Sequence, residues 1–138
     1  METKKRMPLK DYIAGGAVSN AITWIVLGIG GPAVPYDFFI ATYLIGAIFG
    51  GLLVGRKMNQ DYMKTGLLTG LFSFIVHVYV FLGVFWIFSI PTPPLEWHAF
   101  IFSVLLLGSC LGVFLSKLIV LAKPETQKSS QNKQLATE

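Results

Sequence analysis

The chain has 138 residues, of which 54% are apolar and only 13% are charged, and its net charge is +4. A soluble domain usually has about 25% charged residues, so this composition argues against a soluble fold. The eleven basic residues gather near the ends of long apolar runs instead of covering a surface that nucleic acid would recognise. No nucleic-acid partner is therefore expected.

Four apolar stretches are long enough to cross a membrane, since a span needs about 20 mostly apolar residues for a hydrocarbon core of about 30 Å. The predicted spans are residues 12–30, 37–55, 63–90 and 97–122, within a transmembrane domain of residues 11–123. The expected fold is all-α, an integral membrane four-helix bundle that has the lipid bilayer as its first partner. A basic segment (1–10) precedes it, and a polar tail (124–138), predicted to be disordered, follows it.

The basic residues predict the orientation of the bundle. They lie before the first span, between the second and third spans, and at or beyond the end of the fourth. The loops after the first and third spans contain no lysine or arginine. Because basic residues are enriched in cytoplasmic loops, both termini are expected in the cytoplasm and the protein in the cell membrane as a multi-pass protein.

The two halves of the domain are similar in sequence. The stretch "DYIAGGAVSNAITW" begins at Asp11, and "DYMKTGLLTGLFSF" begins at Asp61. Each would open a hairpin that is closed by a proline-containing turn, "GGPAVP" or "PTPP". Two interpretations stay open: two duplicated helical hairpins, or the small-residue periodicity that is common in membrane helices.

Small residues recur at a spacing that places them on one helix face. Four pairs of glycines stand four residues apart and predict close helix packing. These candidate packing residues are Gly46, Gly50, Gly51, Gly55, Gly66, Gly70, Gly108 and Gly112. They are expected to pack within the bundle, while some of these faces could instead meet another membrane subunit or a second copy of the chain.

The glycine-rich second span "YLIGAIFGGLLVG" and the following "TGLLTG" carry a resemblance. With the turn and basic loop around them, they resemble small glycine-zipper four-span membrane proteins of prokaryotes, whose function is unknown. The similarity covers roughly residues 13–75. It implies a four-helix fold in a prokaryotic cell membrane, and it implies no activity and no functional residues.

The polar residue that most needs explaining is His77, inside the third predicted span. On a helix it shares a stripe with Gly66, Gly70 and Ser73. The first span offers Asn20 and Thr23 at a matching position. In one interpretation His77 is neutral and forms a hydrogen bond with Asn20, Thr23 or Ser73 that stabilises the bundle. In the other it titrates during transport or binds a cofactor.

No metal or other cofactor is expected from the sequence. His77 is placed near the middle of the membrane and His98 at its outer surface, so the two are not expected to share an ion. Two acidic residues, Asp37 and Glu96, begin the second and fourth spans on the outer side. They are either solvated helix-start residues, which the helix dipole favours, or an acidic mouth that attracts cations.

The chain lacks a phosphate loop, a dinucleotide fingerprint and a nucleophile elbow, so an enzyme is not expected. The expected function is that of a non-catalytic accessory or assembly subunit of a larger membrane complex. The alternative is a small transporter or channel that works as an oligomer, with His77 lining the path. These two interpretations predict different partners, other membrane subunits in the first and copies of the same chain in the second.

Overall fold

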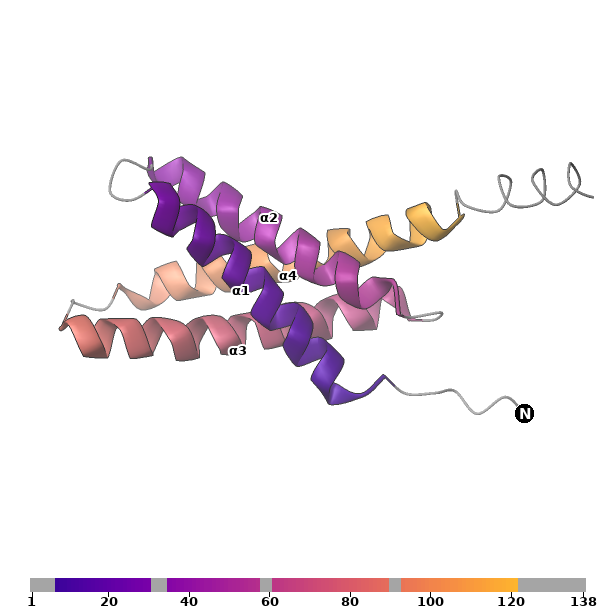
Figure 1. The fold of residues 1–138 in the computed structure, drawn as a ribbon, viewed down its shortest axis with the longest axis horizontal. Coiled ribbons are helices and arrows are strands. Elements are labelled where there is room, and N and C mark those ends of the chain that lie inside the picture. Colours follow the sequence, from indigo (N-terminus) through magenta and orange to yellow (C-terminus); the bar gives the residue numbers. More distant parts are fainter. Residues whose placement is uncertain (1–6, 31–34, 58–60, 90–92, 122–138) are drawn as a thin grey trace, which may run out of the picture.

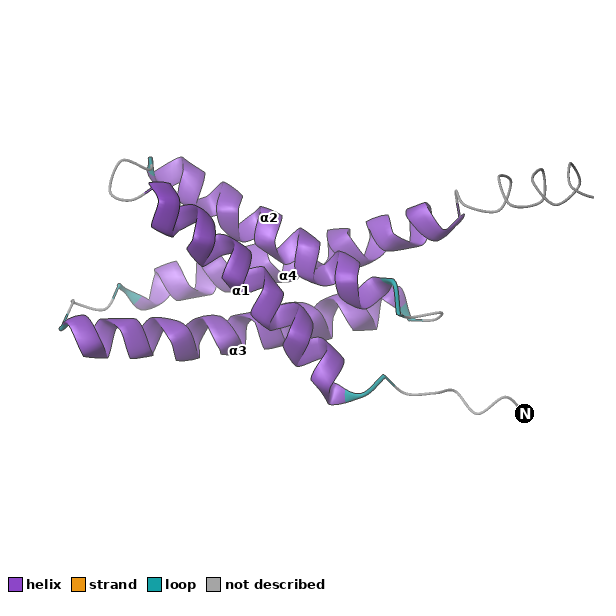
Figure 2. Ribbon diagram, in the orientation of Figure 1, coloured by secondary structure: helices purple, strands orange, loops and turns teal. Residues whose placement is uncertain are grey.

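The computed structural model describes residues 7–30, 35–57, 61–89 and 93–121. Within these ranges the regular elements are four α-helices (Figures 1 and 2), namely α1 (Leu9–Gly30), α2 (Tyr36–Gly55), α3 (Tyr62–Phe88) and α4 (Leu95–Leu121). The all-α prediction is confirmed, and each predicted span overlaps one helix. The expected span ends at residues 90 and 122 and the tail 124–138 lie outside the described residues.

Prolines set where three of the helices begin. The carbonyl oxygens of Pro8, Pro35 and Pro94 each accept the backbone N–H three residues later, at 3.0, 2.9 and 3.1 Å. Proline suits this place because its fixed φ starts the helix and its missing N–H would have had no helical partner. Helix α3 ends where Ser89 takes a positive φ of 50°, a backbone conformation that often terminates helices.

Each helix runs antiparallel to the next one in the chain, so the end of each helix lies near the start of the next (Figure 1). The start of α1, the end of α2, the start of α3 and the end of α4 share one side of the bundle, at the right of Figure 1. Helices α2 and α4 have the most extensive contact, α1 packs on α2 and α3, and α3 packs on α4. At the shared end Lys57 forms an exposed ion pair with Asp11 at 2.7 Å.

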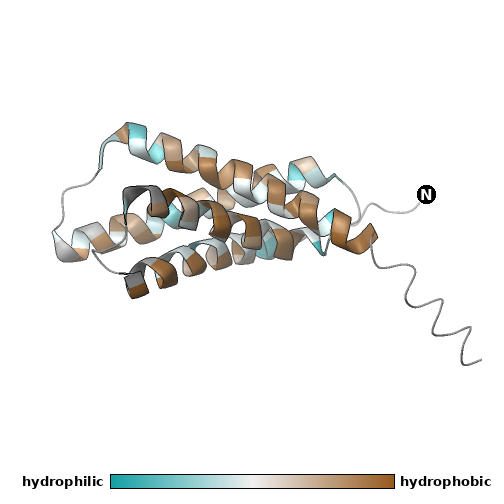
Figure 3. Cartoon of the chain, turned by 90° about the horizontal axis from the view of Figure 1, so that it is seen from above, coloured by the Kyte–Doolittle hydropathy of each residue, from teal (hydrophilic) through white to brown (hydrophobic). Residues whose placement is uncertain are grey.

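Three of the helices are long and apolar enough to cross a membrane: Phe38–Gly55 in α2, Tyr62–Val84 in α3 and Leu95–Leu121 in α4. The coarse prediction of a multi-pass membrane protein agrees with this, and the apolar colouring of these helices is visible in Figure 3. Helix α1 is not among the three in the described part of the chain. Its residues include Lys10 and Asp11 in the first turn and the polar pair Ser19 and Asn20, which lower its hydropathy.

The bundle buries small and polar side chains and exposes large apolar ones. The fully or almost fully buried polar residues are Ser19, Asn20, Thr23, Thr42, Thr65, Thr69, Ser73, His77, Ser109 and Ser116. Large side chains such as Ile25, Leu107 and Phe114 are more than half exposed. An apolar outer surface of this extent would promote aggregation in water, whereas lipid tails would cover it at little cost.

The glycines of α2 divide between two neighbouring helices. A Cβ atom added to Gly50 would meet the Gly15 carbonyl oxygen of α1 at 2.5 Å, and Gly46 faces the Ser19 carbonyl of the same helix. Gly51 and Gly55 face α4 instead, at Ser109 and Ser116. Each pair therefore brings two backbones into direct contact on its own side of α2.

Helices α3 and α4 use their glycines in the same way. A Cβ at Gly66 would lie 2.7 Å from the Cys110 Cα atom, and one at Gly70 would lie 2.8 Å from the Leu106 Cα atom. On α4, Gly108 would meet the Ala47 Cβ atom at 2.7 Å, and Gly112 faces the Ile48 carbonyl. All eight glycines that the sequence singles out thus pack against helices of their own chain.

We expect Gly70→Ala to destabilise the bundle and Gly83→Ala to leave it intact. The added methyl group at Gly70 would overlap α4, and overpacking of this kind costs about 1–3 kcal/mol. At Gly83, on the same helix, an added methyl group would have no atom within 4 Å, so alanine there should gain up to about 1 kcal/mol of helix propensity. Unfolding in a detergent titration measures both changes, and equal stabilities would contradict the assigned packing.

Candidate functional site

A polar stripe follows α3 through the interior of the bundle. Thr65, Thr69, Ser73 and His77 stand four residues apart, and all four are fully buried. The Thr69 hydroxyl donates to the Thr65 carbonyl and the Ser73 hydroxyl donates to the Thr69 carbonyl, each at 2.8 Å. The helix itself therefore satisfies the hydroxyl groups in the middle of the stripe.

Two polar side chains of α1 tie this stripe to the neighbouring helices. The Asn20 Nδ2 atom donates to the Ser73 carbonyl oxygen on α3 at 2.8 Å and to the Gly16 carbonyl at 2.9 Å. The Thr23 hydroxyl lies 3.1 Å from the Ser19 carbonyl and 3.3 Å from the Thr42 carbonyl on α2. These interhelical contacts go to backbone oxygens and leave His77 out.

His77 is fully buried, and within the described residues neither of its ring nitrogens has a hydrogen-bond partner. The expected bond from His77 to Asn20, Thr23 or Ser73 is therefore not present. The donors of Asn20, Thr23 and Ser73 are engaged by backbone carbonyls instead, and the Asn20 Oδ1 atom, which could accept a bond from the imidazole, also has no partner in the described residues. The imidazole lies one turn further along α3 than Ser73, toward the C-terminal end of that helix.

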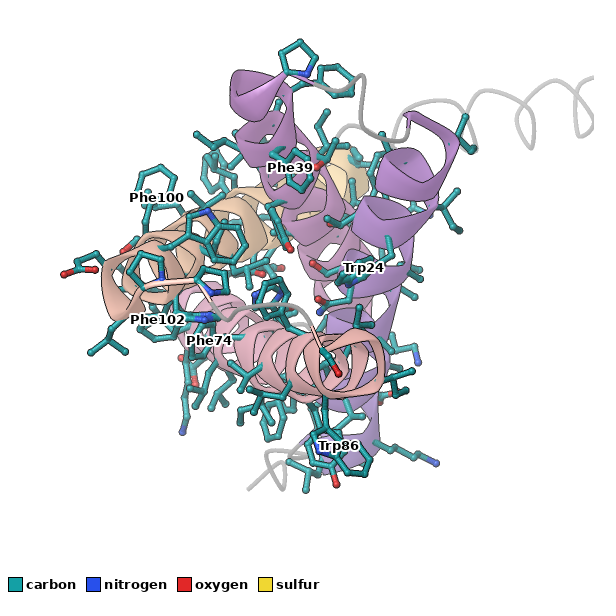
Figure 4. The ribbon with its side chains drawn as sticks, turned by 90° about the vertical axis from the view of Figure 1, so that its left-hand side faces the viewer. Trp24, Phe39, Phe74, Trp86, Phe100 and Phe102 are labelled. Atoms are coloured by element: carbon teal, nitrogen blue, oxygen red, sulfur yellow. The ribbon has the colours of Figure 1, made fainter. Side chains whose placement is uncertain are left out.

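Five rings surround His77, and we call them the aromatic box. Their centroids lie 5.1 Å (Tyr43), 6.3 Å (Phe74), 5.2 Å (Phe81), 6.0 Å (Trp97) and 6.2 Å (His98) from the His77 centroid. They come from α2, α3 and α4. Phe74 also packs on Phe102 of α4, with ring centroids 4.8 Å apart, and Figure 4 shows these two rings together. The box is thus part of the contact between α3 and α4.

The contact between His77 and His98 corrects the expectation that they lie at different depths. His77 lies eleven residues before the end of α3, whereas His98 lies only three residues after the start of α4. The difference of eight residues means that α3 extends about 12 Å further at this end, given a rise of about 1.5 Å per residue. The sequence-based expectation assumed that both helices end at the same height.

The two outer acidic residues lie in the first turns of their helices. Glu96 is exposed in the first turn of α4. Asp37 lies in the first turn of α2, and its side chain is outside the described part. In the described residues, no three histidine, cysteine or carboxylate side chains come close enough to hold a metal between them.

The sequence singled out His77, Asn20, Thr23 and Ser73; the structure buries all four, but among them it joins only Asn20 and Ser73 by a hydrogen bond. The sequence did not indicate Tyr43 and Trp97 as neighbours of His77. Comparisons with known protein families, with curated proteins and with solved structures found no match for this chain. The function is therefore inferred from the chain's own geometry.

We expect His77→Phe to be at least as stable as the parent protein when both are purified with a chelator. Phenylalanine would keep the ring contacts and remove two buried polar atoms without partners, each of which costs about 1–3 kcal/mol. Thermal unfolding in detergent measures the difference. A loss above about 1 kcal/mol would mean that an imidazole nitrogen forms a stabilising hydrogen bond after all.

Proposed function

We propose that the chain is an integral membrane protein that serves as a non-catalytic accessory or assembly subunit of a larger membrane complex. The observation that supports this is the segment of α3 from Leu82 to Phe88, just beyond the aromatic box, whose end reaches further than the ends of the other three helices (Figure 1). This segment, which we call the α3 overhang, is almost entirely apolar.

The α3 overhang has large side chains that nothing in the described bundle covers. Trp86 is 86% exposed and points away from the other helices in Figure 4. Leu82 and Ile87 are also more than half exposed. Gly83 lies between them with open space around it, so the backbone of another helix could approach closely there.

The level of Glu96 argues that protein, and not lipid alone, covers the α3 overhang. A carboxylate in the hydrocarbon core costs about 2.5–3.5 kcal/mol, so the membrane surface should lie near the start of α4. The overhang then projects beyond the hydrocarbon core, where an exposed apolar patch marks an interaction site. A neighbouring subunit with an apolar surface of its own would bury it.

The alternative, an oligomeric transporter with His77 on its path, receives less support from this geometry. His77 is enclosed by rings of α2, α3 and α4 within one bundle. A path formed between copies of the chain would run along outer faces of the helices and would not reach it. The eight packing glycines are likewise engaged inside the bundle.

We expect Trp86→Ala to dissociate the complex while leaving the bundle folded. Leu107→Ala is the matched control, because Leu107 is 65% exposed on α4, away from the α3 overhang. Central aromatic residues of an interface often cost about 2 kcal/mol or more when truncated, which is a loss of about 30-fold in affinity. Native electrophoresis after gentle solubilisation measures the effect. An unchanged complex in Trp86→Ala, or one that contains only this chain, would contradict the proposal.

We also expect both termini in the cytoplasm, as the positions of the eleven basic residues suggest. In a Cys110→Ser background, single cysteines replacing Val34 or Pro93 should react with an impermeant maleimide in intact cells. Cysteines replacing Asn59 or Ser130 should react only after the cells are opened. Labelling at position 59 in intact cells would show that the predicted orientation is wrong.

A further inference from the structure

Three buried imidazole nitrogens in the aromatic box have no hydrogen-bond partner among the described residues: Nδ1 and Nε2 of His77 and Nδ1 of His98. A neutral imidazole carries one donor and one acceptor, so each of these atoms needs a partner. Five other buried polar atoms of the described residues also have no partner, but the three imidazole nitrogens belong to two rings in contact, and groups of this kind often indicate an ion or a water molecule. The box is therefore a place where a small ligand would stabilise the protein.

The distance between the two rings fits one ion held between them. A metal–nitrogen bond of about 2.0–2.1 Å places the ion about 3.2 Å from the centre of each imidazole ring. Two rings on opposite sides of one ion are then up to about 6.4 Å apart. The His77 and His98 centroids are 6.2 Å apart, which corresponds to a nearly linear arrangement. Rotation of each ring about χ2, a soft torsion, can turn a nitrogen toward the other ring.

We propose that His77 and His98 bind one monovalent copper ion inside the aromatic box. Imidazole is a good ligand for copper, and copper(I) accepts two nitrogen ligands in a nearly linear geometry. Zinc prefers four ligands in a tetrahedron, and the box offers two imidazoles. This site does not depend on the partner subunit proposed above.

The groups around the two histidines favour a monovalent ion over a divalent one. The other rings of the box are uncharged, and Glu96, the acidic residue nearest to His98 in the sequence, is exposed. A divalent ion without a neutralising anion would be far more costly to bury, because the desolvation of an ion grows steeply with its charge. The faces of Phe81 and Trp97, whose centroids lie 5.4 and 5.5 Å from that of His98, can attract a cation through their π-systems.

The position of His98 provides a route for the ion. His98 is only half buried and lies in the first turns of α4, at the end of the bundle that carries Glu96. An ion that reaches His98 from this end is then close to His77, whose ring centroid is 6.2 Å from that of His98. The fully buried His77 would complete the coordination.

The test uses the full chain in detergent under anaerobic conditions, with Trp24→Phe, Trp86→Phe and Cys110→Ser as background. Trp97 is then the single tryptophan, and its ring lies 6.0 Å from His77 and 5.5 Å from His98. Copper(I) is added from a coloured chelator that reports the free ion. We expect one equivalent per chain to be retained, together with quenching of Trp97 fluorescence. Retention of no copper would overturn the proposal.

Substitution of either histidine distinguishes binding at this site from binding to other sulfur or nitrogen atoms of the chain. His98→Phe should lower copper(I) affinity by at least about 100-fold, more than the loss of an outer-shell group usually does, and should abolish quenching. His77→Phe should do the same. Phe102→Leu is the control, since Phe102 packs on Phe74 outside the aromatic box and has no ligand atom, and it should retain the ion.

Circular dichroism of each variant confirms that the helices remain, and His98→Phe, at a half-buried position, keeps the test valid if His77→Phe misfolds. Copper that binds equally to both histidine variants would overturn the proposal. Displacement of the ion by equimolar zinc would overturn its assignment as monovalent.

Discussion

The contact between α2 and α4 is the constraint on which the rest of the bundle depends. Gly51 faces Ser109, and Gly112 faces Ile48, so the two backbones touch directly. Gly46 and Gly50, on another side of α2, bring the backbone of α1 similarly close. Close backbone contact of this kind adds dispersion attraction to the burial of large side chains, because Tyr43, Ile101 and Leu105 form a core between the same two helices.

Close packing of this kind also determines what the interior contains. Where helices touch through glycine, many buried positions are serine or threonine, and the hydroxyls of Thr23, Thr69 and Ser73 bond to carbonyls of their own helix. Asn20 is the main exception, since it reaches the Ser73 carbonyl across the interface of α1 and α3. Full-sized rings fill the space between helices around His77, and Tyr12 and Phe72 also stack between α1 and α3. The aromatic box differs from that pair because it holds two imidazoles.

The sequence predicted the helices well because length, hydropathy and proline positions are local properties. It also predicted the packing role of the glycines, since a spacing of four residues places them on one face whatever their partner is. The neighbours of His77 could not be predicted, because they depend on how far α3 is shifted along α4. The expected bonds to Asn20 and Thr23 failed for a second reason, which is that backbone carbonyls competed for those side chains and a sequence pattern does not show them.

The register of α3 against α4 connects the α3 overhang with the aromatic box. In the observed register, Gly66 and Gly70 of α3 pack against Cys110 and Leu106 of α4. That register carries the end of α3 past the start of α4, and it also places His77 beside His98. If α3 were shifted along α4 by one helical turn, about 5.4 Å, its exposed apolar end would become shorter and the two imidazoles would move apart. An uncovered helix end and a pair of adjacent histidines are therefore two results of the same glycine contacts.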